Sequence, residues 1–174
     1  EGVFTRVLQF LRSAVAVNRL KGETYGLIGG RSMGMYTAQA PLDQWRRQFG
    51  IDIEHIDQFE IVRRANGIPE DRVKHGFAWL ERHVGKIHYD GDKLTPELLK
   101  RQIREIIEEW RLDFCGIKGQ PELTDHFCTM DIAEAFLNDP YDWEGYHDPI
   151  VCATEADMDG ALTMEIFKHL TGTP

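Results

Sequence analysis

The sequence predicts an α/β fold, specifically a three-layer α/β/α domain with a parallel sheet of about four to five strands. Short apolar or alternating segments at residues 25–30, 51–56, 113–118 and 149–154 have the pattern of strands. Segments with apolar residues at helical spacing separate these strands. A length of 174 residues suits one domain, so residues 1–174 are expected to form a single α/β domain.

The first half of the chain alternates between the two patterns. Apolar side chains recur at helical spacing over residues 4–17. Residues 25–30 then form a short apolar run that ends in a glycine turn, which is typical of a buried strand. A helical pattern follows over residues 42–49, and apolar and polar residues alternate over residues 51–56, as in a strand with one buried face.

The middle of the chain is mainly helical. Helices are predicted over residues 59–65, 69–84 and 95–110, and a strand over residues 113–118. Proline is favoured in the first turn of a helix, as at position 69, and Thr95 is a suitable N-cap for the third helix.

The last part of the chain is predicted to contain a helix over residues 123–137, a strand over residues 149–154 and a closing helix over residues 156–170. In parallel sheets, ligands bind beyond the carboxyl ends of the strands. This rule directs the search for chemistry to three loops, at residues 29–36, 116–125 and 154–160.

Composition excludes several classes of partner. Hydrophobic residues make up 42% and charged residues 28%, as in globular proteins. The net charge of −9 disfavours nucleic acid, and no apolar run approaches the roughly 20 residues that cross a membrane. Cys115, Cys128 and Cys152 each lie among apolar residues, which favours buried, reduced thiols and a cytoplasmic location.

The two ends have the character of cuts at a domain boundary. The chain opens at Glu1 directly before a helical pattern and closes at Pro174 just beyond another.

The first loop is rich in glycine, but its spacing fits neither common nucleotide motif. The glycines do not match G-x-G-x-x-G, and Gly34 is followed by Met35 and Tyr36 instead of Lys-Ser/Thr. We interpret these glycines as a tight turn. Residues 31–36 remain candidates for lining a pocket.

The second loop gathers polar residues after a predicted strand. Gln120 can both donate and accept hydrogen bonds, which suits a polyol substrate. Composition alone favours a simple turn with a helix cap at Thr124 or Asp125.

The third loop places Glu155, Asp157 and Asp159 directly after a buried strand. It departs from a calcium-binding EF-hand because position twelve is Ile166 and a strand precedes it. Glu155, nearest the strand, is well placed to bind a hard cation such as Mn²⁺ or Mg²⁺, whereas the two aspartates suit the start of the next helix. The seven histidines form no metal-binding motif, so further metal ligands are expected from outside this chain.

Four stretches of the sequence resemble L-fucose isomerases, at residues 25–37, 49–62, 115–124 and 151–163. Examples are Tyr-Gly-Leu-Ile-Gly-Gly-Arg-Ser-Met-Gly-Met-Tyr-Thr in the first and Val-Cys-Ala-Thr-Glu-Ala-Asp-Met-Asp-Gly-Ala-Leu-Thr in the last. The resemblance covers essentially the whole chain. It implies the middle, or second N-terminal, domain of a subunit whose first N-terminal domain and barrel-like C-terminal domain are absent here.

The resemblance implies a metal-dependent aldose–ketose isomerase that interconverts L-fucose with L-fuculose, and D-arabinose with D-ribulose. The implied cofactor is Mn²⁺ and the implied assembly a homo-oligomer, typically a hexamer. Glu155 matches the catalytic glutamate, which binds the metal and transfers a proton between C2 and C1 of the sugar. Gln120 matches a glutamine that contacts the substrate.

The same resemblance places a second catalytic carboxylate beyond Pro174 and a histidine ligand in the C-terminal domain. This chain alone is therefore expected to be inactive and to bind Mn²⁺ weakly. The alternatives are a non-catalytic scaffold or oligomerisation module, an independent sugar- or nucleotide-binding domain, and a domain of the L-arabinose isomerase type. The quoted stretches favour the fucose type.

Overall fold

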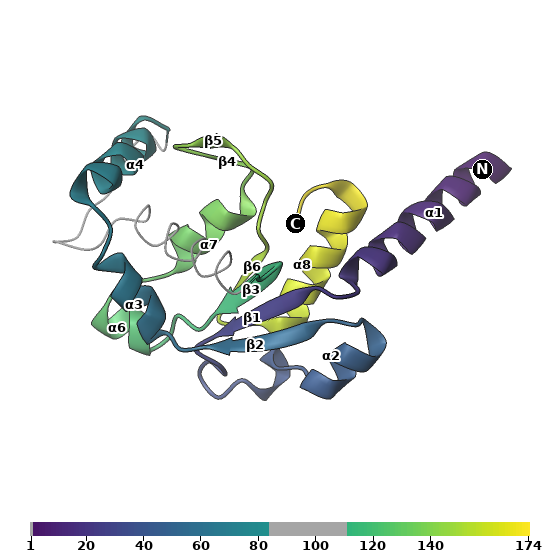
Figure 1. Cartoon of the computed structure of the whole chain (residues 1–174), viewed down its shortest axis with the longest axis horizontal. Helices are drawn as coiled ribbons and strands as arrows, with labels where there is room; N and C mark the ends of the chain where they lie inside the picture. Colours follow the sequence, from purple (N-terminus) through teal and green to yellow (C-terminus); the bar gives the residue numbers. More distant parts are fainter. Residues whose placement is uncertain (1, 84–110) are drawn as a thin grey trace.

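A four-stranded parallel sheet forms the centre of the molecule, with strand order β2-β1-β3-β6 (Figure 1). The computed structural model describes residues 2–83 and 111–174. Helices cover both faces of the sheet, so the predicted three-layer α/β/α class is confirmed. All four predicted strands are present: β1 (Thr24–Ile28), β2 (Asp52–Ile56), β3 (Phe114–Ile117) and β6 (Cys152–Thr154).

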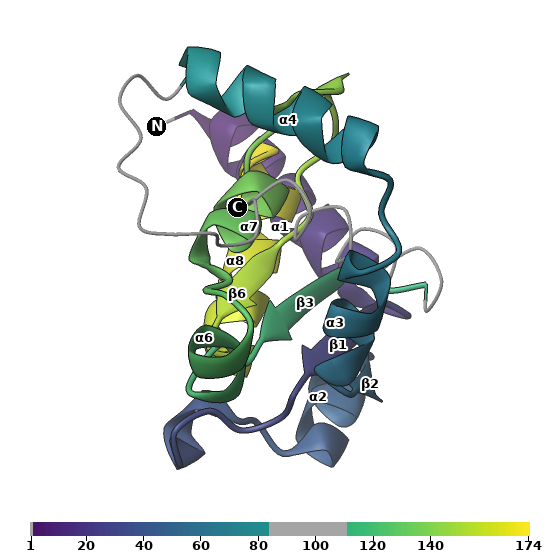
Figure 2. The same cartoon turned by 90° about the vertical axis from the view of Figure 1, so that its left-hand side faces the viewer.

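One face of the sheet packs against α3 (Phe59–Ala65), α6 (Glu122–His126) and α7 (Asp131–Asn138), which lie on this side in Figure 2. The buried core there is mainly apolar, because strand residues that point to this face meet the inward faces of the helices, although Glu134 on α7 is also buried. Its members include Ile28, Ile61, Cys115, Ile117, Leu123, Ala133, Leu137 and Cys152.

The other face packs against α2 (Leu42–Gln48), α8 (Met158–Thr171) and the end of α1 (Val3–Leu20). Three buried aromatic rings anchor this layer. The ring centroid of Tyr25 lies 5.4 Å from that of Trp45 and 5.0 Å from that of Phe114. Such edge-on and tilted contacts add to the burial of apolar area.

The two cores follow from the alternation of side chains along each strand. Phe114 points to the aromatic core and Cys115 to the opposite one. Gly26 lies where β1 is crowded, because a Cβ there would be 2.4 Å from Cδ1 of Leu112. A side chain at position 26 would therefore displace Leu112 from the core.

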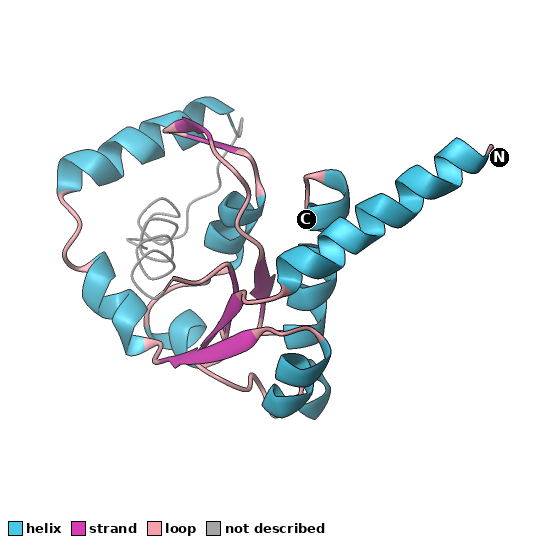
Figure 3. Cartoon of the chain, turned by 45° about the vertical axis from the view of Figure 1, so that its right-hand side comes forward, coloured by secondary structure: helices cyan, strands magenta, loops and turns pink. Residues whose placement is uncertain are grey.

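Helix α1 extends away from the sheet, as Figure 3 shows. Its predicted helical pattern is confirmed, but only Ala16 and Leu20 are buried. Phe4 is 74% and Phe10 is 72% exposed, so most of the apolar residues of this helix face solvent.

The predicted helix over residues 123–137 is wrong as a single element. The structure has α6 and α7 separated by a turn, in which Phe127 leaves the helical conformation at φ −138° and ψ −83°. The turn allows Cys128 and Met130 to enter the core, which a continuous helix would point elsewhere. Burial of these side chains thus overrides local helix propensity.

A small hairpin of β4 (Tyr141–Asp142) and β5 (Gly145–Tyr146) was not expected. Trp143 in its turn is buried, and its ring lies 5.7 Å from that of Phe136. The ring of Phe136 in turn lies 5.9 Å from that of Trp79 on α4 (Glu70–His83), so these aromatic rings join the hairpin, α7 and α4.

The other helices agree with prediction near their expected ends, with a short 3₁₀ helix η1 (Tyr36–Ala38) in the first loop. The helix predicted over residues 95–110 lies outside the described residues. Within the described part of the chain, none of the helices is long and apolar enough to cross a membrane. The three cysteines are free and buried, as predicted.

Candidate active site at the carboxyl edge of the sheet

The three loops selected from the sequence meet at one edge of the sheet. Ile28 in β1 is the register partner of Ile117 in β3, and Ile117 is the partner of Thr154 in β6. The loops that follow these strands therefore begin at the same level. The chain crosses from β1 to β2 on one side while β3 lies on the other, and such a switch point is where open α/β sheets bind ligands.

The carboxylate of Glu155 is held by groups from the other two loops. The hydroxyl of Ser32 donates a hydrogen bond to its Oε2. The backbone N–H of Gln120 donates to the same oxygen at 3.1 Å. These two hydrogen bonds hold Oε2 in place, so the neighbouring loops orient this carboxylate.

The second oxygen of Glu155, Oε1, accepts no hydrogen bond from residues 2–83 or 111–174. Gly119 approaches it closely, because a Cβ at that position would lie 3.1 Å from Oε1. Glycine at position 119 therefore leaves room for this oxygen, whereas a side chain there would crowd it.

Ser32 is the residue at this edge that sequence reasoning missed. It is 1% exposed, and its hydroxyl also lies 3.2 Å from the carbonyl oxygen of Gln120. Residues 31–36 were proposed only as a pocket lining. The signal available in the sequence was a small polar residue among the glycines of a loop that follows a buried strand.

The turn that carries Glu155 is tight and strained. Glu155 and Ala156 have φ values of 52° and 55°, in the left-handed region that non-glycine residues rarely adopt. Each such residue costs of order 1–3 kcal/mol, and backbone strain of this kind clusters at functional sites. The N–H of Ala156 donates to the carbonyl of Ile117 at 2.9 Å, which ties the turn to β3.

The remaining carboxylates of this loop have the structural role expected for them. Asp157 is the N-cap of α8, and its side chain accepts a hydrogen bond from the N–H of Gly160 at 3.0 Å. Asp159 lies exposed in the first turn of the same helix. Glu155 is thus the member of the three whose side chain contacts the neighbouring loops.

Gln120 lies at the same edge, but its contacts with Ser32 and Glu155 are made by its backbone. The residue is exposed. Its predicted contact with a substrate through the carboxamide remains a prediction.

A depression of about 430 Å³ adjoins this edge at the ends of β1 and β2. Glu155 does not line it. Gln58 does, and its Nε2 also donates to the carbonyl of Lys118, linking the end of β2 to the second loop. The depression and the Glu155 loops thus share the carboxyl edge of the sheet.

These features define a parallel α/β domain that presents one oriented carboxylate at the switch point of its sheet. Residues 95–172 match the sequence model of the second N-terminal domain of L-fucose isomerase. Over 202 aligned positions the chain is 27% identical to an L-fucose isomerase of Klebsiella pneumoniae, covering 97% of this chain and 34% of that protein. The L-fucose isomerase of Bacteroides fragilis is 29% identical with the same coverage, and that of Escherichia coli is 27% identical over 198 positions.

The chain is thus similar to L-fucose isomerases over nearly its whole length, and residues 95–172 are similar to their second N-terminal domain. It spans about a third of the length of the curated relatives that it matches.

Proposed function

We propose that the chain is the middle domain of a metal-dependent sugar isomerase and supplies one catalytic carboxylate, Glu155. The reaction proposed is the interconversion of L-fucose with L-fuculose, and of D-arabinose with D-ribulose. The observation that carries the proposal is the orientation of Glu155 by Ser32 and Gln120 in a chain similar to L-fucose isomerases.

The carboxylate of Glu155 can supply one ligand to Mn²⁺. Oxygen donors suit this ion, and Oε1 accepts no hydrogen bond from the described residues. In the described part of the chain, the group of three potential metal ligands lies elsewhere, so Glu155 would need ligands from the rest of the protein. When bound, the cation would polarise the sugar carbonyl and stabilise the negative charge that develops next to it.

The proposed work of this chain is positioning and proton transfer. Ser32 and Gln120 fix Oε2, which leaves Oε1 without a hydrogen-bond donor from the described residues. A carboxylate held in this way can accept the proton from C2 of the sugar and return it to C1. The side chain of Gln120 is proposed to bind a sugar hydroxyl.

The proposal also includes an assembly in which neighbouring subunits complete the pocket, a hexamer, and a cytoplasmic location. A homo-oligomer would bring the missing groups to the exposed carboxyl edge.

The test is Glu155→Gln in the full-length protein, measured as conversion of L-fucose and of D-arabinose with Mn²⁺ and after chelation. Loss of a positioned general base is expected to lower kcat by about 10²–10⁴-fold, with folding and assembly intact. Asp159→Asn is the matched control, because it removes a neighbouring exposed carboxylate, and should retain activity.

Metal-dependent conversion that survives Glu155→Gln would support the scaffold alternative instead. No conversion of either sugar by folded, Mn²⁺-loaded wild-type protein would overturn the proposed reaction. The ratio of the two rates names the preferred sugar.

A further inference from the structure

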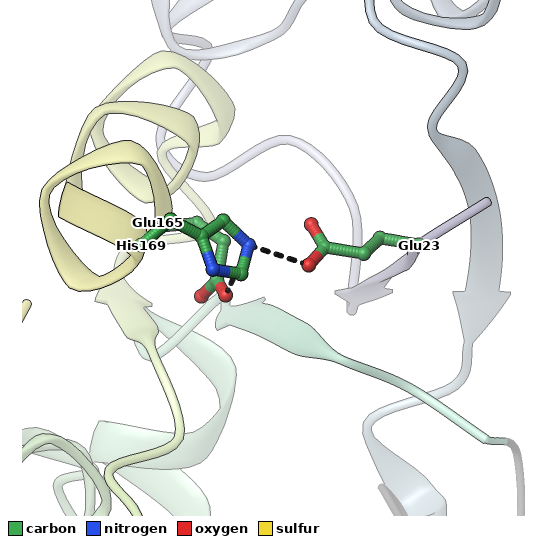
Figure 4. A group of neighbouring side chains, drawn as sticks. All are labelled: Glu23, Glu165 and His169. Carbon is green, nitrogen blue, oxygen red and sulfur yellow. Dashed lines mark hydrogen bonds and ion pairs between the residues drawn. The ribbon is translucent and has the colours of Figure 1, made fainter. Parts of the chain in front are cut away.

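A second cluster of titratable side chains lies at the amino edge of the sheet, opposite Glu155. Glu23 directly precedes β1, and Glu165 and His169 lie one turn apart on α8. Figure 4 shows their side chains pointing toward one another. One ligand atom from each lies within 4.8 Å of the other two.

One contact in this cluster has the spacing of two ligands around a tetrahedral ion, and the other is a hydrogen bond between His169 and Glu23. Nε2 of His169 lies 3.3 Å from Oε1 of Glu165 and 2.6 Å from Oε1 of Glu23. Two ligands at about 2.0–2.1 Å from a tetrahedral ion are about 3.3 Å apart. The first distance already has this value, and the second requires Glu23 to move by roughly 0.7 Å.

An unsatisfied oxygen is a second and independent observation. Oε2 of Glu23 is buried and has no hydrogen-bond partner among the described residues, and the whole residue is only 9% exposed. Glu165 is 1% exposed. Buried carboxylates normally have a partner, because burying an unpaired one is costly. A bound cation would supply a partner for the carboxylate of Glu23.

Lys168 is the competing cation. Its Nζ lies 3.0 Å from Oε1 and 3.3 Å from Oε2 of Glu165. The side chain of Lys168 is 21% exposed, so its ammonium can contact Oε2 of Glu165 alone, which frees Oε1, or it can turn toward solvent. Two ionised carboxylates and one ammonium have a net charge of −1, so the cluster can take up further positive charge from a divalent ion.

We propose that Glu23, Glu165 and His169 bind one divalent transition-metal ion of the Zn²⁺ class at the amino edge of the sheet. The mixed imidazole and carboxylate donors suit Zn²⁺, with water in a fourth position. The ion would join α8 to the start of β1. It is a separate site from the one proposed at Glu155, which offers oxygen alone.

The test measures Zn²⁺ binding by chelator-stripped, full-length protein in competition with a chromophoric chelator. His169→Gln and Glu23→Gln should each weaken binding at one site by roughly tenfold or more. Glu155→Gln should leave that site intact, which separates it from the isomerase metal. His126→Gln, in the short helix α6 at the other edge, is the matched histidine control.

Thermal unfolding gives a second readout. Zn²⁺ should raise the Tm of the wild-type protein and of Glu155→Gln, because an ion that binds the folded state stabilises it. In the Glu155→Gln background, which lacks the other proposed metal ligand, the rise should disappear when His169→Gln or Glu23→Gln is added. An unchanged Zn²⁺ affinity and Tm rise in both variants would overturn the site.

If the glutamine variants do not fold, anomalous diffraction at the zinc edge from wild-type crystals decides the matter. A peak between Glu23 and His169 supports the site. Its absence at saturating Zn²⁺ rejects it.

Discussion

At the scale of single residues, the hydroxyl of Ser32 is the contact that sets the orientation of Glu155. Ser32→Ala removes one of two donors to Oε2 and leaves the backbone N–H of Gln120. A hydrogen bond to a charged group contributes about 1.5–3 kcal/mol, so kcat should fall roughly 10- to 100-fold with little change in KM.

A double-mutant cycle checks this assignment. In the Glu155→Gln background, Ser32→Ala should have little further effect on kcat, because the two residues act as one unit. Additive losses would show that Ser32 acts on something other than this carboxylate.

Glu134 on α7 should make stability depend on pH. Burial is the main cause that raises the pKa of this carboxyl from 4.5 to about 7, and its Oε1 is buried with no hydrogen-bond partner among the described residues. The folded state thus keeps a proton that the unfolded state loses near its ordinary pKa. Stability should fall as pH rises from about 4.5 to about 7 and level off above.

The Glu134→Gln variant isolates this contribution. We compare the decrease in the free energy of unfolding between pH 5 and pH 8, measured with urea, in the variant and in the wild type. This decrease should be smaller in the variant by roughly 2 to 3 kcal/mol. The part of the fall that remains belongs to other buried carboxyls such as Glu23, whose pKa is raised in the same direction. An identical fall in the variant would mean that Glu134 is ionised in the folded protein.

At the scale of elements, the start of α8 depends on its cap. Asp157→Ala removes the acceptor for the N–H of Gly160 and should lower the free energy of unfolding by about 1 kcal/mol. Asp159→Ala, in the first turn of the same helix, should cost a few tenths of that value. Equal losses in the two variants, measured by urea unfolding, would contradict the capping role.

Prediction of elements succeeded where local pattern and burial agree. The apolar run before Gly29 and the alternating segment before Asp57 both became strands, because the pleat exposes alternate side chains to different surroundings. The break between α6 and α7 was missed, since only tertiary packing rewards the burial of Cys128 and Met130. The hairpin around Trp143 was missed because its two strands have only two residues each.

At the scale of the whole molecule, the fold class and the edge that carries the candidate site follow from the sequence, whereas the contacts at that edge do not. Residues 32, 120 and 155 are far apart in the chain, and the sheet order alone brings them together. The cluster of Glu23, Glu165 and His169 was missed for the same reason, because Glu23 and α8 are far apart in the sequence and meet only in the folded chain.

The isolated chain of 174 residues should not convert L-fucose or D-arabinose, even with excess Mn²⁺. Among the described residues, Glu155 is the carboxylate that the neighbouring loops hold at the candidate site, and a first-row ion needs several ligands to act as a Lewis acid. Assay of the isolated chain beside the full-length protein checks this expectation. Rapid conversion by the chain alone would contradict it.

The three buried thiols make the transient opening of this domain's core measurable. Cys115 and Cys152 sit opposite each other on neighbouring strands, and Cys128 lies in the same core. An alkylating reagent can reach them only while the sheet and its covering helices are transiently apart. The rate at which each thiol is labelled therefore reports how often that part of the core opens, in unmodified protein and without an added probe.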